Sequence, residues 1–221
     1  MTKTINLGVL GIDHGHIFDM LDEMLKEGCS CNYFWTEGSP LTLDEFRKKY
    51  PQIKRVDNKS DILNDDTIDM ILISSIPKDR ANLSIDAMKA GKDVMVDKPG
   101  CTTLEQLNNL KQTVKETGKI WSINFSERFH VAAVTKAEEL VAEGKIGKVK
   151  QTIGTGPHRQ GNYERPDWFY DRDSYGGIIT DIGSHQIHQF LVFTNSNEAK
   201  VNHALVENTT KKELSGFQDY R

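Results

Sequence analysis

Two short stretches of this chain carry residue types that can do proton-transfer chemistry. The first is Asp97-Lys98-Pro99, which follows the apolar run at 94–96. That run predicts a buried strand, and Pro99 ends strand pairing because proline has no amide hydrogen. Ligands of open α/β sheets bind beyond the carboxyl ends of the strands, so Lys98 lies where chemistry is expected. The alternative interpretation is a solvated loop lysine paired with Asp97.

The second stretch runs from Asp181 to His188. His185 and His188 are three residues apart, so on a helix they share one face, and Asp181 is placed to cap that helix. A histidine oriented by a carboxylate can move a proton to or from a substrate hydroxyl. The alternative is that both histidines are hydrogen-bonded interior residues with no catalytic role. Asp, His and His on one face also permit a metal site, but no metal is expected because zinc-site spacing is absent.

A third candidate is the turn at 11–16, which follows an apolar strand and precedes a helix. It aligns with the G-x-G-x-x-G dinucleotide fingerprint, but only Gly11 is in place. Asp13 replaces the second glycine and His16 the third, with Gly15 adjacent to it. The helix N-terminus still offers amide hydrogens to a phosphate, and His14 or His16 can assist. A purely structural turn is the alternative.

Glu37 follows the second expected strand, 26 residues after Gly11. An acidic residue near this position binds the ribose hydroxyls in dinucleotide sites. If Glu37 does so, NAD is preferred to NADP, because a carboxylate repels a 2′-phosphate. A solvated loop glutamate is the alternative.

The elements that must position these residues alternate along the first half of the chain. Strands are expected at 5–12, 32–36, 53–56, 68–74, 94–96 and 120–125, with helices at 17–27, 43–50, 59–64, 80–90 and 103–117. This alternation predicts a doubly wound parallel sheet, a Rossmann domain at 1–125.

The pattern changes in the second half. A helix at 131–143, strands at 148–154 and 201–206, a long loop at 157–175 and a helix at 183–193 are expected. So few strands predict a partial α+β domain at 126–221, apparently truncated or completed by another chain.

Composition excludes several classes of protein. A net charge of -4 in 221 residues gives no electrostatic basis for nucleic-acid binding, and no apolar run is long enough to span a membrane. The three cysteines lack metal-site or C-x-x-C spacing and are expected to be reduced thiols. The start of the chain does not read as a signal peptide, so a cytoplasmic protein is expected.

Four runs in order resemble the Gfo/Idh/MocA family of NAD(P)-dependent oxidoreductases. They are the N-terminal strand-turn-helix, the strand at 68–73 leading to Ser75-Ile76-Pro77, the run AGKDVMVDKP at 90–99 and the run GGIITDIGSH at 176–185. The run at 124–129 also matches, and the resemblance covers nearly the whole chain. The chain departs from the family pattern at Asp13 and His16, at Arg80, where a histidine is frequent, and at His188, where aspartate is frequent.

The resemblance implies hydride transfer between a nicotinamide cofactor, NAD or NADP, and the carbinol of a sugar, inositol or related polyol. Lys98 would contact the nicotinamide ribose and the substrate, and His185, beside Asp181, would exchange the proton. The residues expected to bind the cofactor are Gly11, Asp13, His14, Gly15, His16, Glu37, Ser75, Pro77, Asp97, Lys98 and Pro99. Those expected to bind the substrate are Arg128, Arg159, Tyr163, Trp168 and His188. The family also implies a homo-oligomer, a dimer or larger.

Two other functions remain open. The altered glycine turn suits a non-enzymatic protein that binds a ligand or regulates a partner, a relic of a dehydrogenase. Asp181, His185 and His188 together suit a metal-assisted lyase or hydrolase.

Overall fold

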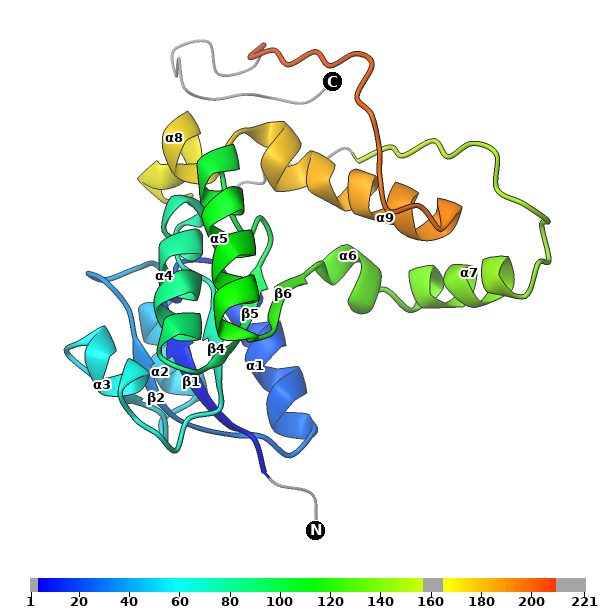
Figure 1. Cartoon of the computed structure of the whole chain (residues 1–221). Coiled ribbons are helices and arrows are strands. Elements are labelled where there is room, and N and C mark those ends of the chain that lie inside the picture. The colour runs from blue at the N-terminus through cyan, green and yellow to red at the C-terminus, as the bar shows by residue number, and fades with distance from the viewer. Residues whose placement is uncertain (1–3, 157–164, 210–221) are drawn as a thin grey trace. The chain divides into compact units, whose positions relative to one another are not determined.

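The computed structural model describes residues 4–156 and 165–209. The chain divides into two compact units, 1–124 and 125–221, each of which is described by itself. The first unit alternates strands and helices along its whole length (Figure 1). Its elements are β1 (Asn6–Leu10), α1 (His16–Lys26), β2 (Ser30–Trp35), α2 (Leu43–Lys49), β3 (Lys54–Arg55), α3 (Lys59–Leu63), β4 (Met70–Ile73), α4 (Pro77–Lys89), β5 (Asp93–Asp97), α5 (Leu104–Thr117) and β6 (Trp121–Asn124).

The six strands form one parallel sheet in the order β3-β2-β1-β4-β5-β6. Leu10, the last residue of β1, is in register with Trp35 of β2 and Ile73 of β4, and Ile73 is in register with Val96 of β5. The strands therefore end at a common edge. The chain reverses direction of winding at β1, so the crevice beyond β1 and β4 is the switch point at which such sheets bind ligands. The predicted Rossmann architecture is confirmed.

Both faces of the sheet are covered, because alternate residues of each strand point to opposite sides. Leu72 and Val9 belong to an apolar cluster with α1 and α2, whereas Ile71, Ile73 and Val94 belong to a second cluster with α3, α4 and α5. Helices α4 and α5 lie side by side over that second face (Figure 1). The sheet is thus a middle layer, packed on both faces, that positions the loops at the carboxyl ends of its strands.

Local signals set the ends of several helices. Thr103 caps α5 by accepting a hydrogen bond from the Gln106 amide at 3.1 Å. Gly118 ends the same helix in the left-handed conformation, with φ of 66°. Pro77 occupies the first turn of α4, where its missing amide hydrogen costs nothing.

The secondary-structure elements in the described part of the second unit are helices and helical turns, joined by irregular segments. It contains α6 (Ser126–Phe129), α7 (Ala132–Ala142), the 3-10 turn η1 (Asp167–Tyr170), α8 (Arg172–Tyr175), the π-turn η2 (Ile179–Gly183) and α9 (Ser184–Thr194). The strands expected at 148–154 and 201–206 were wrong predictions, since neither segment is a strand here. A strand needs a neighbour to pair with its backbone groups, and among the described residues neither segment has one.

Within the described ranges, the chain contains no helix that is both long and apolar enough to cross a membrane. The three cysteines, Cys29, Cys31 and Cys101, are free thiols, as the sequence predicts.

Candidate functional site

The turn after β1 packs tightly against the start of the loop after β4. Gly11 has φ of 78°, and a Cβ built on it would lie 2.4 Å from the Ser75 Cβ. The Gly11 amide donates to the Trp35 carbonyl at 2.7 Å, and the His14 amide donates to the Ser74 carbonyl at 3.0 Å. Only glycine fits at position 11, so the first fingerprint glycine has a structural reason to be present.

Gly15 is different, because a Cβ built there would meet no atom within 4 Å. It lies at the N-cap of α1, an eleven-residue helix. The first amides of this helix have acceptors within the turn: the His16 amide donates to the His14 Nδ1 at 3.3 Å, and the next two amides donate to the His14 and Gly15 carbonyls. What favours a phosphate at the start of α1 is therefore the positive end of the helix dipole, with open space at Gly15 beside it.

A cavity of about 360 Å³ opens at this carboxyl edge. Gly11 and Asp13 contribute to it from the turn after β1, Glu37 from the loop after β2, and Ser75 from the loop after β4. Its complete lining is Gly11, Asp13, Trp35, Glu37, Gly38, Lys59, Ser75, Ile76, Asp79, Asn82 and Leu83. The cavity thus joins the glycine turn to the ribose-side glutamate that the sequence singled out.

Three carboxylates, those of Asp13, Glu37 and Asp79, face this cavity together with one lysine, Lys59. Burial raises the pKa of the Asp13 carboxyl to about 6, and the nearby Arg80 limits the rise. Asp13 therefore loses its charge more readily than an exposed aspartate, which reduces its repulsion of a diphosphate at mildly acid pH.

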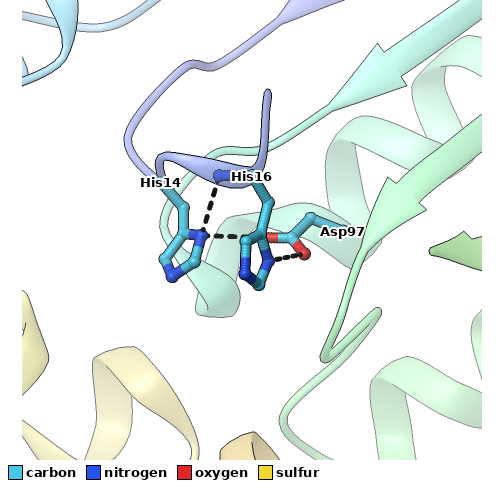
Figure 2. Close-up of side chains that lie close together, drawn as sticks. All are labelled: His14, His16 and Asp97. Carbon is cyan, nitrogen blue, oxygen red and sulfur yellow. Dashed lines mark hydrogen bonds and ion pairs between the residues drawn. The ribbon is translucent and has the colours of Figure 1, made fainter. Parts of the chain in front are cut away.

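The Asp97 carboxylate is the centre of a buried polar network at the end of β5 (Figure 2). Its Oδ2 accepts a hydrogen bond from the Arg80 guanidinium at 2.9 Å, and its Oδ1 lies 2.8 Å from the His16 Nδ1. The His14 Nδ1 lies 3.3 Å from Oδ2. Burial opposes ionisation of Asp97, but the Arg80 charge and the two histidines hold its pKa below the usual range.

Burial also lowers the pKa of His14 to about 3, although the charge of Asp97 acts in the opposite direction. His14 is therefore a neutral imidazole at physiological pH. His16, which replaces the third fingerprint glycine, and His14 both contact the Asp97 carboxylate, so neither is simply a surface group available to a phosphate.

Arg80 is the residue of this site that the sequence analysis missed as a functional candidate. It is fully buried and donates to the carbonyls of Ser75, Asp97, Lys98 and Pro99 at 2.8, 3.1, 2.5 and 3.3 Å. One side chain thus fixes the loops after β4 and β5 together. The available signal was an arginine on the mostly apolar, buried face of a helix.

Lys98 is buried, with 4% of its surface exposed, so the solvated-lysine interpretation is wrong. It precedes Pro99 through a cis peptide bond, and its carbonyl accepts from Arg80. A buried lysine at the carboxyl edge is held in place by the fold, as a residue that contacts a ligand must be.

In the second unit, His185 and Asp181 are buried residues of the segment that contains η2 and α9. Asp181 lies inside the π-turn and not at the N-cap of α9, which is Gly183, so its predicted capping role was wrong. His185 lines a cavity of about 240 Å³ with Glu127, Thr155, Gly156, Ile182, Gln186 and Gln189. Glu127 is a further charged residue of this cavity that the sequence analysis did not identify.

The residues expected to bind the substrate make different kinds of contact within the second unit. His188 stacks on Phe125 with ring centroids 4.1 Å apart, and Arg128 forms two hydrogen bonds to Glu138 at 2.6 and 3.0 Å. Trp168 belongs to η1 and packs edge-on against Phe169. Arg159 and Tyr163 lie outside the described residues. In the described ranges, Asp181, His185 and His188 do not gather their ligand atoms in one place.

Models of two protein domains match this chain. Residues 40–125 match the model described as "Oxidoreductase family, NAD-binding Rossmann fold", and residues 134–220 match the "GFO/IDH/MocA C-terminal domain". The two matches follow one another and together cover most of the chain.

Curated relatives and solved structures give the same picture. The chain is 25% identical over 194 residues to scyllo-inositol 2-dehydrogenase (NADP(+)) of Bacillus subtilis strain 168, covering 85% of this chain and 51% of that protein. It is 30% identical to D-xylose dehydrogenase of Paenarthrobacter nicotinovorans over 56% of this chain and 33% of that protein. A crystal structure of a putative oxidoreductase from Erwinia carotovora atroseptica SCRI1043 matches with a TM-score of 0.94 and 38% identity, over 98% of this chain and 64% of that one. The chain spans about half the length of the first of these relatives and a third of the second.

Proposed function

Because this chain belongs to the Gfo/Idh/MocA oxidoreductase family, we propose that it transfers a hydride between a nicotinamide cofactor and the carbinol carbon of a sugar, inositol or related polyol. The observation that carries the proposal is the cavity at the carboxyl edge, which is lined by Gly11, Glu37 and Ser75. The buried Asp97-Lys98-Pro99 segment ends β5 at the same edge. Relatives named for scyllo-inositol, D-xylose and 1,5-anhydro-D-fructose support the polyol class.

The residues present fit a dinucleotide at most points of this edge. The open space at Gly15 and the positive end of the α1 dipole suit a diphosphate, and the Glu37 carboxylate suits the adenosine ribose hydroxyls. We propose that Ser75, Pro77 and Pro99 shape the loops around the cofactor, and that His14 and His16 contribute from the turn. Glu37 favours NAD, since it would repel the additional phosphate of NADP.

When bound, the nicotinamide supplies the hydride acceptor or donor. Lys98 would hold the nicotinamide ribose and the substrate oxygen through its ammonium group. His185 would take or return the hydroxyl proton, with Asp181 nearby on the preceding turn. We propose that the domain predicted at 126–221 supplies the substrate contacts, among them Arg128, Arg159, Tyr163, Trp168 and His188. A homo-oligomer is also proposed, and sedimentation velocity at several concentrations tests it.

The first experiment measures cofactor binding. Titration with NADH and NADPH, followed by energy transfer from the tryptophans to the nicotinamide, should show saturable binding with NADH preferred. Glu37→Gln should narrow the preference, because the repelling carboxylate is gone, whereas the exposed Glu27→Gln should leave it unchanged. Failure of the folded chain to bind either nucleotide contradicts the proposal.

The second experiment measures turnover in a screen of sugars, inositols and related polyols. Lys98→Ala and His185→Ala should each lower turnover by roughly 10²-fold or more, the usual contribution of a positioned acid or base. Lys111→Ala and His203→Ala, at exposed positions, are the matched controls. Undiminished turnover in both active-site variants would exclude these residues.

A second candidate function is ligand binding without redox chemistry. The observation that favours it is the presence of three carboxylates, Asp13, Glu37 and Asp79, in the cofactor cavity, since they oppose a diphosphate. Tight binding of a nucleotide or sugar with no oxidation or reduction across the whole screen would support this candidate. Any turnover that depends on Lys98 removes it.

A further inference from the structure

His14, His16 and Asp97 bring three metal-ligand side chains to one place. They come from two segments more than 80 residues apart, the turn that starts α1 and the end of β5 (Figure 2). One ligand atom from each lies within 4.8 Å of the other two. Two imidazoles and one carboxylate on a single face are a common ligand set for divalent transition metals.

The distances suit a shared ion. The His16 Nδ1 lies 2.8 Å from Asp97 Oδ1, and the His14 Nδ1 lies 3.3 Å from Asp97 Oδ2. Ligand atoms held about 2.0–2.1 Å from one zinc ion are roughly 3–3.5 Å apart. Both separations are therefore close to the spacing that one shared ion requires.

The His14 ring provides an independent argument. The His16 backbone amide donates a hydrogen bond to the His14 Nδ1 at 3.3 Å, so this nitrogen presents a lone pair. The same nitrogen lies 3.3 Å from an oxygen of the Asp97 carboxylate, which also presents lone pairs. Two electron-pair donors at this distance repel one another, and a cation bound by both converts the repulsion into attraction.

The surroundings of Asp97 resemble the outer shell of a metal site. The Arg80 guanidinium donates to its Oδ2 at 2.9 Å, and the Ser74 hydroxyl lies 3.4 Å from the same oxygen. Hydrogen bonds of this kind hold a ligating carboxylate in one orientation. The two imidazole nitrogens favour zinc, cobalt or nickel over hard cations such as Mg²⁺.

We propose that His14, His16 and Asp97 form a binding site for one divalent transition-metal ion, with the remaining coordination positions open to water or a ligand. This goes beyond the proposed hydride transfer, which needs no metal and assigns these residues only to the cofactor. The proposed site lies in the part of the turn at which the second and third glycines of the dinucleotide fingerprint are absent.

The test uses the full chain, stripped with a chelator and titrated with Co²⁺ in the absence of nucleotide. Calorimetry should give one site per chain, the visible spectrum of Co²⁺ should show nitrogen ligation, and Zn²⁺ but not Mg²⁺ should displace it. His14→Gln and His16→Gln should each weaken Co²⁺ binding by about tenfold or more. His203→Gln, at an exposed position in the second unit, should bind as the unchanged protein does.

Asp97 variants are not needed, since loss of this buried carboxylate can prevent folding. Circular dichroism verifies that each histidine variant is folded. Absence of saturable Co²⁺ binding, or binding that is equal in His14→Gln, His16→Gln and the unchanged protein, overturns the proposal. Cofactor binding is measured separately, so its failure leaves this result interpretable.

Discussion

At the scale of single residues, Arg80 holds together the two loops that carry candidate site residues. Its guanidinium neutralises a carboxylate that has no exposure to solvent and also satisfies carbonyl groups of two loops. Buried ion pairs are costly to break, because removing one partner leaves an uncompensated charge. The loops that carry Ser75 and Lys98 therefore depend on this one side chain.

Arg80→Met should lower the free energy of unfolding by about 3–5 kcal/mol, measured by urea denaturation. Lys26→Met is the control, because it removes an ion pair with Glu23 in which both side chains are more than half exposed. Such exposed pairs contribute little to stability, because water and salt screen the two charges. If both variants lose the same amount, Asp97 does not depend on Arg80.

At the scale of elements, the turn between β1 and α1 contains two glycines with different structural roles. Gly11 has a positive φ and packs against Ser75, whereas Gly15 has φ of -62° and open space around it. Gly11 allows the turn after β1 to pack closely against the loop after β4. Gly15 leaves room beside the first amides of α1.

Gly11→Ala should lower the free energy of unfolding by about 2–5 kcal/mol, because it adds left-handed strain to overpacking. Gly15→Ala should change stability by about 0.5 kcal/mol or less, yet raise the Kd for NADH, since its methyl group occupies the space proposed for the diphosphate. Thermal unfolding and nucleotide titration of both variants check this pair. Unchanged NADH affinity in Gly15→Ala would place the diphosphate elsewhere.

Helix α9 contributes a pH-sensitive contact to the second unit. Burial against Phe125, followed by the charge of Arg128, lowers the pKa of His188. A histidine with a lowered folded-state pKa binds fewer protons in the folded chain than in the unfolded chain. Its contribution to stability is therefore present above the unfolded pKa of 6.5 and is lost as pH falls below that value.

His188→Gln should reduce the loss of stability between pH 7 and pH 5, because glutamine has no proton to bind. Denaturation of the variant and of the unchanged protein at both pH values measures the difference. His203→Gln is the matched control, because His203 is exposed. An identical pH dependence in His188→Gln would show that His188 does not titrate with unfolding.

At the scale of the whole molecule, the two units differ in how much they bury. Both large apolar clusters belong to the sheet and helices of the first unit. In the described part of the second unit, several large apolar side chains are exposed, among them Ile146, Ile153, Val201 and Leu205. Low local burial is typical of regions that open at small free-energy cost.

Amide hydrogen exchange should therefore be slowest in β1, β4 and β5 and faster in α7 and α9. Mass spectrometry of peptides from the intact chain, exchanged at one pH, measures this order. Equal protection of both units would show that the second unit is stabilised by contacts beyond its own core, for instance in the proposed oligomer.

The sequence by itself determined the parallel sheet, the positions of its helices and the placement of Lys98 at a strand end. These follow from apolar periodicity, turn glycines and caps such as Thr103, which act over a few residues. Only the tertiary structure decided that Arg80 is buried against Asp97, and that His14 and His16 turn towards the same carboxylate. It also decided that the segments at 148–154 and 201–206 do not become strands. The physical reason is that ion pairing across 17 or 81 residues, and pairing of a strand with its neighbour, depend on contacts that no local pattern encodes.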